Sequence, residues 1–376
     1  MKPWLPPVVL TLSLMPALPA QSRETGSAFR DKDGALDLSE WLLDRRGFLP
    51  VPVVITEPAV GYGAGLFALF FRQSIREAVA NAKGRLEPPD IFVVGGFTTQ
   101  NGTWLGAAGG MVSFDDHRYR WRGGVARLSA NLDFFGLGGN LPAALAYNAD
   151  GWASIQQGMM RLGQSDAWLV GRWNYFDLNN RFDIESDAGR GGSIVRSSKS
   201  SGLGASIEFD SRDNIFTPSS GWKGGLDLTY YDPDWGSDTR FRTARAYAFA
   251  YWPVNKSLVL GGRFDAQAAN GDVPFYLLPF VALRGVPALR LQDRRTAVIE
   301  TEARYNFTPR WAVVAFAGAA RAWGTSTSFS EGTDSRAGGF GFRYQIAERL
   351  GMYVGMDFAW STQDRAFYIQ VGSPWR

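Results

Sequence analysis

The sequence predicts an all-β protein, a transmembrane antiparallel β-barrel of 16 strands with a short N-terminal helix. Three observations lead to this prediction. From Val51 to near the C-terminus, segments of alternating character recur between polar or glycine-rich turns. The connections between these segments alternate in length. The composition, with 44 glycines, 14 tryptophans and no cysteine among 376 residues, favours strands and tight turns over helices.

Residues 1–20 are predicted to be a secretory signal peptide. A basic residue precedes an apolar run over 5–18, and the small residue Ala20 stands before a polar one. No later stretch reaches about 18 uninterrupted apolar residues, the minimum for a membrane-spanning helix. The exported chain is therefore expected to be either a soluble protein or a β-barrel.

Residues 21–49 are expected to form a short N-terminal segment ahead of a barrel at 50–376. The segment is shorter than the roughly 50 residues of the smallest usual domain. Within it, the stretch DLSEWLLD at 37–44 predicts a short helix with Asp37 or Ser39 as its N-cap. Such a helix could plug the barrel or lie beneath it.

The alternation has a period of two, as a strand requires. In 299–304 the even positions are charged and the odd positions are apolar or neutral. In 352–360 the even positions are apolar, and Asp357 lies on the opposite face. Sixteen strands are predicted, near residues 50–56, 60–71, 90–99, 103–114, 117–132, 151–162, 166–177, 202–210, 221–231, 240–252, 257–268, 297–306, 310–320, 336–345, 351–360 and 366–372.

Long connections are predicted at one end of the strands and short turns at the other. This asymmetry and the even strand count are typical of outer-membrane barrels, with long surface loops and short periplasmic turns. One connection departs from it: residues 72–89 are long, predicted helical and predicted periplasmic. The predicted long loops are residues 133–150, 178–201, 232–239, 269–296 and 321–335.

A soluble β-sandwich would also show alternation, so the placement of the aromatic residues decides between the two. Tryptophan and tyrosine gather near strand ends, as at Trp222, Trp252 and Trp360, which is the pattern of interfacial girdles. In a barrel the charged face of 299–304 must line the lumen, because a lipid-facing charge at mid-bilayer costs about 2–4 kcal/mol.

Three motifs carry a resemblance to a known family. LRGVP at 283–287 lies in the long loop before the twelfth predicted strand, DSRDNIFTPSSGW occupies 210–222, and FYIQVGSPWR closes the chain. With these motifs, residues 48–376 resemble the BamA/TamA family of outer-membrane barrels, also called the bacterial surface antigen family. The start of the chain resembles shorter relatives that lack the periplasmic repeat domains.

The resemblance implies site residues. In the family an Arg-Gly motif lies on a loop folded back into the lumen, which here implies Leu283, Arg284 and Gly285. An Asp-Arg-Asp periplasmic turn implies Asp210, Arg212 and Asp213. A closing strand that the assembly machinery reads by its C-terminal aromatic residue implies Phe367, Tyr368 and Trp375.

The sequence departs from the family pattern at Gly318, where the family carries the aspartate that pairs with the loop arginine. A buried guanidinium without a partner is costly. Arg284 is therefore expected to pair with another lumen-facing acid, and Glu300, Glu302 and Asp357 are the candidates. At the chain end, Trp375 stands where the family usually has Phe, followed by one further residue.

The resemblance implies a place in the bacterial outer membrane and a role in inserting or translocating proteins there. Outer-membrane lipid and other outer-membrane proteins or assembly machinery are the implied partners. The alternative is a passive pore or a structural surface-antigen barrel. Lumen-facing charges are balanced seven against seven, which suits ion pairs around an inserted loop better than ion selection. They are Arg118, Arg120, Arg122, Lys223, Arg263, Arg304 and Arg343 against Glu208, Asp210, Asp227, Asp265, Glu300, Glu302 and Asp357.

Other function classes find little support in the sequence. The net charge of +3 is spread along the chain without a basic block, which argues against nucleic acid. Without cysteine there is no disulfide or cysteine-based zinc site. His117, the single histidine, stands beside Asp115 and Asp116 with no nucleophile arrangement, so neither catalysis nor a cofactor or metal is expected. The glycine-rich stretch 189–202 lacks the order of a phosphate-binding loop and is predicted to be a surface loop.

Overall fold

The computed structural model describes residues 29–30, 34–77, 88–141, 143–184 and 192–375. The predicted signal peptide and most of the predicted helical connection at 72–89 lie outside these residues; within that connection, residues 75–77 are helical. No helix in the described ranges is long and apolar enough to cross a membrane.

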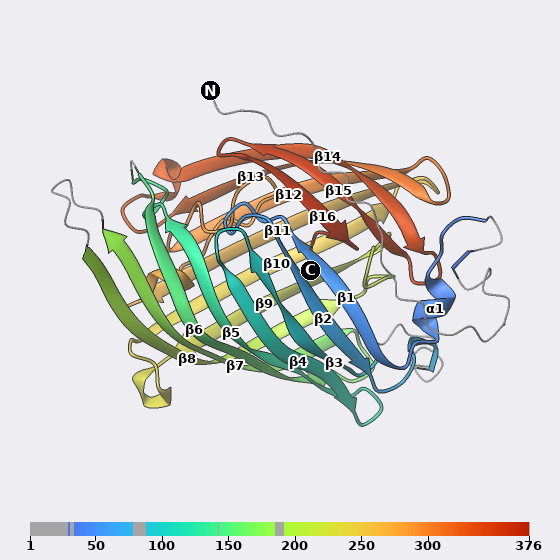
Figure 1. The fold of residues 1–376 in the computed structure, drawn as a ribbon, viewed down its shortest axis with the longest axis horizontal. Coiled ribbons are helices and arrows are strands. Elements are labelled where there is room, and N and C mark those ends of the chain that lie inside the picture. Colours follow the sequence, from blue (N-terminus) through green and yellow to red (C-terminus); the bar gives the residue numbers. More distant parts are fainter. Residues whose placement is uncertain (1–28, 31–33, 78–87, 142, 185–191, 376) are drawn as a thin grey trace.

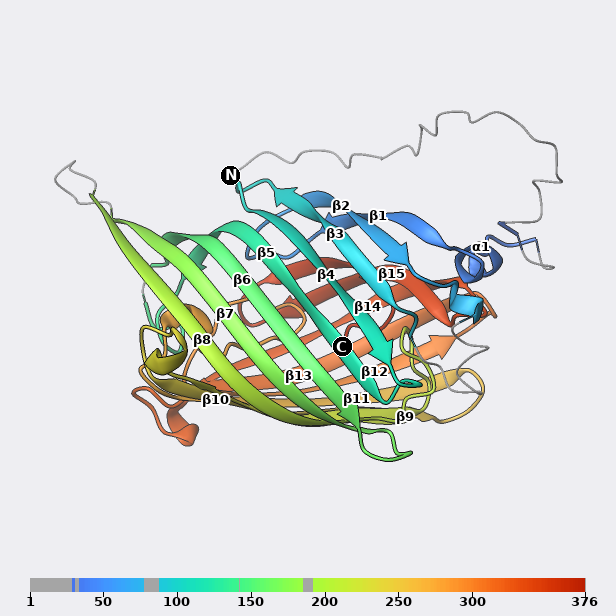
Figure 2. The ribbon, with the colours of Figure 1, turned by 90° about the horizontal axis from the view of Figure 1, so that it is seen from below.

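The protein is a single 16-stranded sheet curled into a barrel, with tilted strands (Figures 1 and 2). Every strand pairs antiparallel with the strand that follows it in sequence, which confirms the predicted fold class and strand number. The strands are β1 (Gly47–Ile55), β2 (Gly63–Phe71), β3 (Ile91–Thr99), β4 (Trp104–Phe114), β5 (Tyr119–Phe134), β6 (Leu145–Arg161), β7 (Ala167–Ile184), β8 (Gly192–Asp210), β9 (Gly221–Tyr231), β10 (Phe241–Pro253), β11 (Leu258–Gly271), β12 (Arg295–Asn306), β13 (Trp311–Trp323), β14 (Thr333–Ala347), β15 (Met352–Ser361) and β16 (Arg365–Val371).

The two ends of the barrel differ. The end where β1 begins, called here the turn end, carries the short helix α1 (Ser39–Leu43) and the short turns, such as 307–310 and 348–351. The opposite end, called here the loop end, carries the longest described connection, residues 272–294. Short one-turn helices lie in three of its loops: η1 (Pro233–Trp235), η2 (Phe275–Leu277) and η3 (Phe329–Glu331).

Two of the predicted long loops are wrong. Residues 145–150 belong to β6 and 192–201 to β8, and β7 runs to Ile184, so the predicted surface loop at 189–202 is largely strand. In 145–150 the alternation continues on one face, and on the other Asn148 bonds Asn131 across β5 and β6. In 192–201 the apolar alternation stops, but the ladder with β7 continues with mainly polar side chains. Hydrophobic periodicity detects a strand only where one face is apolar.

The N-terminal helix is present, but its predicted N-cap is wrong. The N-cap position is Leu38, which makes no side-chain capping bond. The Asp37 carboxylate instead accepts the Ser39 N–H at 2.6 Å. The first strand begins at Gly47, three residues before the predicted start of the barrel.

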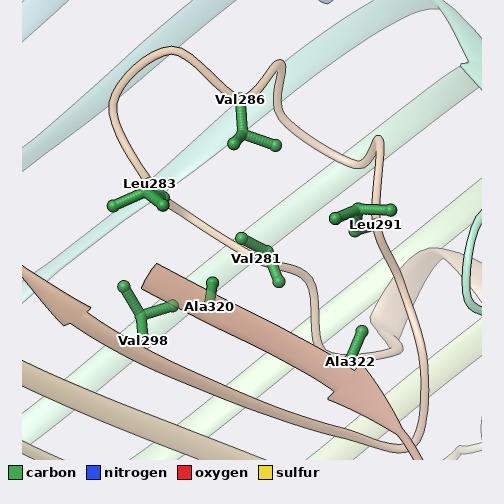
Figure 3. Close-up of a cluster of buried hydrophobic side chains, with 7 residues drawn as sticks. All are labelled: Val281, Leu283, Val286, Leu291, Val298, Ala320 and Ala322. Atoms are coloured by element: carbon green, nitrogen blue, oxygen red, sulfur yellow. The ribbon is translucent and has the colours of Figure 1, made fainter. Parts of the chain in front are cut away.

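The two faces of the sheet differ as the alternation predicts. On the outer face of β12, Ile299 is 58% exposed, whereas its neighbour Glu300 points inward and is 4% exposed. The loop at 272–294 folds back inside the barrel and covers inward-facing acids of β12 and β15. Four loop residues pack against three side chains of β12 and β13 (Figure 3). The cluster consists of Val281, Leu283, Val286 and Leu291 with Val298, Ala320 and Ala322.

Candidate functional site: the lumen network around Arg284

The loop at 272–294 is held inside the barrel both near its start and at its tip. Near its start, the Phe275 ring lies 5.1–5.6 Å from the rings of Phe134, Tyr147 and Phe182 on β5, β6 and β7. Further on, the Val281 N–H donates to the Leu291 carbonyl at 2.9 Å, which closes the intervening residues into a compact tip. The apolar cluster then holds this tip against the wall.

Gly285 lets the chain reverse at the tip. Its φ of +91° lies in the left-handed region, where a side chain would be strained. Its N–H donates to the Tyr368 hydroxyl at 3.0 Å, and its carbonyl accepts the Ser361 hydroxyl at 2.7 Å. The tip is therefore fixed to β15 and β16 as well as to β12 and β13.

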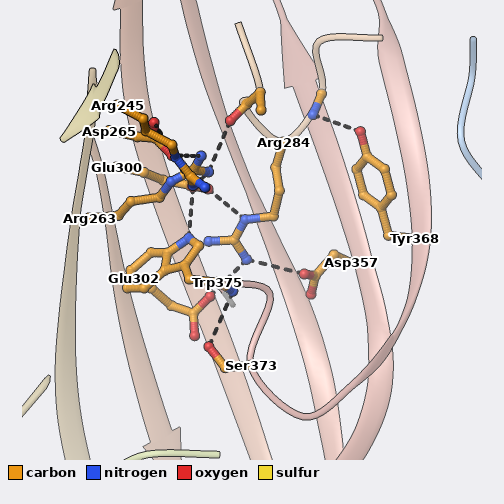
Figure 4. Close-up of polar contacts among 12 residues, drawn as sticks. Arg245, Arg263, Asp265, Arg284, Glu300, Glu302, Asp357, Tyr368, Ser373 and Trp375 are labelled. Carbon is orange, nitrogen blue, oxygen red and sulfur yellow. Dashed lines mark hydrogen bonds and ion pairs between the residues drawn. The ribbon is translucent and has the colours of Figure 1, made fainter. Parts of the chain in front are cut away.

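Arg284 is the centre of the site and is 8% exposed. Its Nε lies 2.6 Å from Glu300 Oε1. Its Nη1 lies 2.7 Å from Glu302 Oε2 and 3.1 Å from Asp357 Oδ2 (Figure 4). The Phe316 ring lies 3.6 Å from the guanidinium carbon, a cation–π contact. The structure thus brings Arg284 together with all three acids that the sequence offered as partners.

The strand register explains why these acids converge. Glu300 and Glu302 are two residues apart on β12 and so share the inner face. Glu300 pairs with Gly318 on β13, and Asp357 projects inward from β15. A side chain at Gly318 would place its Cβ 2.7 Å from Leu283 Cδ1 and 2.7 Å from the Ile299 carbonyl oxygen. An aspartate does not fit there, and Asp357 supplies the third carboxylate instead.

Further arginines balance the acids. Arg343 binds Asp357 through both terminal nitrogens, at 2.6 and 3.0 Å. Arg263 lies 3.6 Å from Glu300 and donates to the Ala282 carbonyl at 2.9 Å. Removing one partner of a buried ion pair leaves the other charge buried without a partner, which costs about 3–5 kcal/mol. A network of this kind therefore fixes the loop position firmly.

The chain end joins the same network. Trp375 is 3% exposed, and its indole N–H donates to Glu300 Oε2 at 2.8 Å. Ser373 meets the Tyr251 hydroxyl at 2.9 Å. Of the predicted C-terminal strand residues, Tyr368 and Trp375 point into the lumen, whereas Phe367 packs beside Phe358 with ring centroids 5.3 Å apart.

The predicted turn motif forms its own contacts. Arg212 makes a bidentate pair with Asp210, at 2.8 and 2.7 Å, and Asp213 accepts the Ser219 N–H at 2.9 Å. These residues lie at the turn end of the barrel. The motif shapes the connection between β8 and β9.

Sequence reasoning missed two lumen arginines. Arg245 on β10 binds Asp265 at 2.7 Å, and Arg172 on β7 lies 3.2 Å from Asp227. Strand pairing could have identified Arg245 as inward-facing. It pairs with Asp227 on β9, and the alternation in the sequence already placed Asp227 on the lumen face. Arg242 is three residues from Arg245 on the same strand. Because neighbouring side chains of a strand alternate between its faces, Arg242 lies on the outer face.

No metal site emerges from the described residues, since they contain no group of three or more His, Asp or Glu side chains that could hold an ion. His117, Asp115 and Asp116 lie together on the turn between β4 and β5.

No family model and no curated protein matches the sequence. Solved structures do match. A BamA structure from Haemophilus ducreyi lacking POTRA domains 1–3 aligns with 88% of this chain and 70% of its own, at 12% identity and a TM-score of 0.59. CdiB from Escherichia coli aligns with 87% of this chain at 14% identity and a TM-score of 0.53. CdiB from Acinetobacter baumannii aligns with 86% at 10% identity and a TM-score of 0.52. The chain spans 59% of each CdiB chain. The protein therefore has the fold of the BamA and CdiB barrels.

Proposed function

We propose that the protein is an outer-membrane barrel of the BamA/TamA family that aids the insertion or translocation of other proteins at that membrane. The main observation in its favour is that Arg284 of the lumen loop forms ion pairs with Glu300, Glu302 and Asp357 of the barrel wall. A barrel whose lumen holds an anchored loop is unsuited to free diffusion of solutes. Such a barrel is suited to contacts with other proteins at its outer surface and at the exposed edges of its first and last strands.

The outer surface supports a membrane location. Large apolar side chains stand exposed around the barrel, among them Ile207 at 57%, Leu228 at 55% and Ile299 at 58%. Tryptophans such as Trp252, at 57%, sit near strand ends, where an interfacial girdle would lie. Outer-membrane barrels have short turns on the periplasmic side and long loops on the cell surface. On this pattern the turn end would face the periplasm and the loop end the outside of the cell. Outer-membrane lipid and other outer-membrane proteins would be the partners.

A passive pore is the second candidate, and two observations favour it. Ile155 follows the inner-face parity of Gln157 on β6, yet it is 45% exposed. The loop meets β6 at Tyr147, through Phe275, and Ile155 lies eight residues further along that strand, where the loop does not cover it. A cavity of about 200 Å³ also opens beside Arg172, Asp227 and Arg245.

Reconstitution into lipid vesicles separates the two candidates. The measurement is the folding rate of a urea-denatured outer-membrane barrel added to vesicles with and without this protein. The proposal predicts faster folding with the wild type and a smaller acceleration with Arg284→Ala. Unchanged folding together with steady ion conductance would favour the pore.

A further inference from the structure

The barrel sheet has two unpaired edges. β1 and β16 stand at its two ends, and no hydrogen-bonded ladder joins them in the described residues. Pro50 and Pro52 in β1 lack N–H groups, as is usual in an edge strand. Since fifteen ladders hold all the other neighbours, contacts outside the sheet must set the spacing of these two edges.

One such contact lies at the loop end. The tip of the lumen loop is bonded through Gly285 to Tyr368 on β16, as described above. Three residues later, the Ala288 N–H donates to the Glu57 carboxylate at 2.9 Å. Glu57 follows β1 by two residues. Three residues of chain span at most about 10 Å, so the loop tip bridges the two edges over a short distance.

A second contact lies at the turn end. Residues 36–46, called here the strap, continue directly into β1 and dock on the far side of the open edge. The Asp37 carboxylate binds Arg310, on the turn between β12 and β13, at 2.5 Å. The Leu38 N–H donates to the Ile346 carbonyl of β14 at 2.7 Å.

The strap also has an apolar side. Leu43 packs with Ala347 and Leu350 at the turn between β14 and β15, and Ile75, which follows β2, packs against the same cluster. Arg76 binds Asp44 of the strap at 2.6 Å. The strap thus joins the β1–β2 side of the sheet to the β14–β15 side.

We propose that these two contacts are clasps that hold the unpaired edges of the barrel together. The Glu57 clasp acts at the loop end and the Asp37 clasp at the turn end. Release of the Glu57 clasp alone loosens the edges at the loop end, and β1 separates from β16 along its length when both are released. Because Gly285 follows Arg284 directly, the Glu57 clasp couples the edge spacing to the lumen network. The inference concerns the barrel alone and does not depend on the proposed function.

The natural absence of cysteine allows a direct test. Spin labels are placed on Val54→Cys of β1 and Ile369→Cys of β16, which are outward-facing positions 53% and 43% exposed. The distance distribution between them is measured by pulsed electron spin resonance in lipid nanodiscs. A second label pair, on the outward-facing Ile207→Cys of β8 and Ile299→Cys of β12, spans four strand spacings, roughly 19 Å, and reports whether the barrel remains folded.

The expected result is one narrow edge distance in the otherwise unaltered protein and a broader, longer distribution in Glu57→Ala/Asp37→Ala, with the control distance unchanged. Glu57→Gln keeps an acceptor oxygen and should behave as the unaltered protein does, whereas Glu57→Ala alone should broaden the edge distance. If the double variant fails to fold, this pair of single variants decides. An edge distance that stays narrow in the folded double variant, or is the same in Glu57→Ala and Glu57→Gln, overturns the proposal.

Discussion

The indole N–H of Trp375 donates to Glu300 at 2.8 Å, so the end of the chain is fixed to the carboxylate that also holds the loop arginine. The chain leaves β16 through Gly372, whose φ is +77°, and turns into the barrel. Gly261 on β11 makes room, since a Cβ there would lie 2.8 Å from the indole ring. The aromatic residue implied as an assembly signal is thus a structural part of the lumen once the barrel has formed.

Trp375→Phe should destabilise the barrel by about 1.5–3 kcal/mol, because the charged Glu300 acceptor loses a buried donor. The measurement is the urea midpoint of unfolding in detergent. Trp252→Phe, an outward position that is 57% exposed, is the matched control and should shift the midpoint little. Equal shifts in the two variants would contradict the account.

Gly318→Ala should loosen the lumen loop. Its Cβ would meet Leu283 and the Ile299 backbone at 2.7 Å, and overpacking of this kind costs about 1–3 kcal/mol. Gly106→Ala on β4 is the control, since a Cβ there meets nothing within 4 Å. Limited proteolysis between residues 283 and 294 should be faster in Gly318→Ala only. Cleavage at the same rate in both variants would mean that Gly318 does not govern the loop.

Docking of the N-terminal strap should weaken in acid. Burial alone would raise the pKa of Asp37, but hydrogen bonds from Ser39 and the ion pair with Arg310 outweigh it and lower the pKa from 3.8 to about 2. A carboxylate whose pKa is lower in the folded than in the unfolded chain stabilises the folded form at any pH above its unfolded-chain pKa. This contribution, about 2 kcal/mol at neutral pH, is lost as the pH falls from about 4 to 2.

A spin label on Leu36→Cys, a position that is 49% exposed, reports strap mobility during this titration. The label should become mobile between about pH 4 and 2 in an otherwise unaltered chain. In Asp37→Asn it should be mobile already at pH 6 and respond little to acid. A transition that is identical in both proteins would show that Asp37 is not the titrating group.

The parts of this structure that could be predicted from the sequence are those in which one face of a strand is apolar. The alternation at 299–304 and 352–360 gave the inward orientation of Glu300, Glu302 and Asp357 because the outer face there is apolar. The same logic fails for 192–201, where polar residues predominate on both faces and the strand continues regardless. In 145–150 an alternation of Leu145, Tyr147 and Ala149 with smaller or polar residues is present, and the prediction misses it. The inward turn of Trp375 depends on contacts with Tyr251 and Glu300, which are distant in sequence, and no local pattern encodes it.

The most direct test of the central claim, that Arg284 anchors a lumen-filling loop, is single-channel conductance in planar bilayers. Wild type, Arg284→Ala and Arg284→Lys are compared under the same salt. The account predicts small or flickering currents for the wild type and larger, steadier ones for Arg284→Ala. Arg284→Lys should be intermediate, because an ammonium keeps the charge but not the forked geometry that reaches Glu300 and Glu302 together. Large steady currents of equal size in all three proteins would contradict the claim.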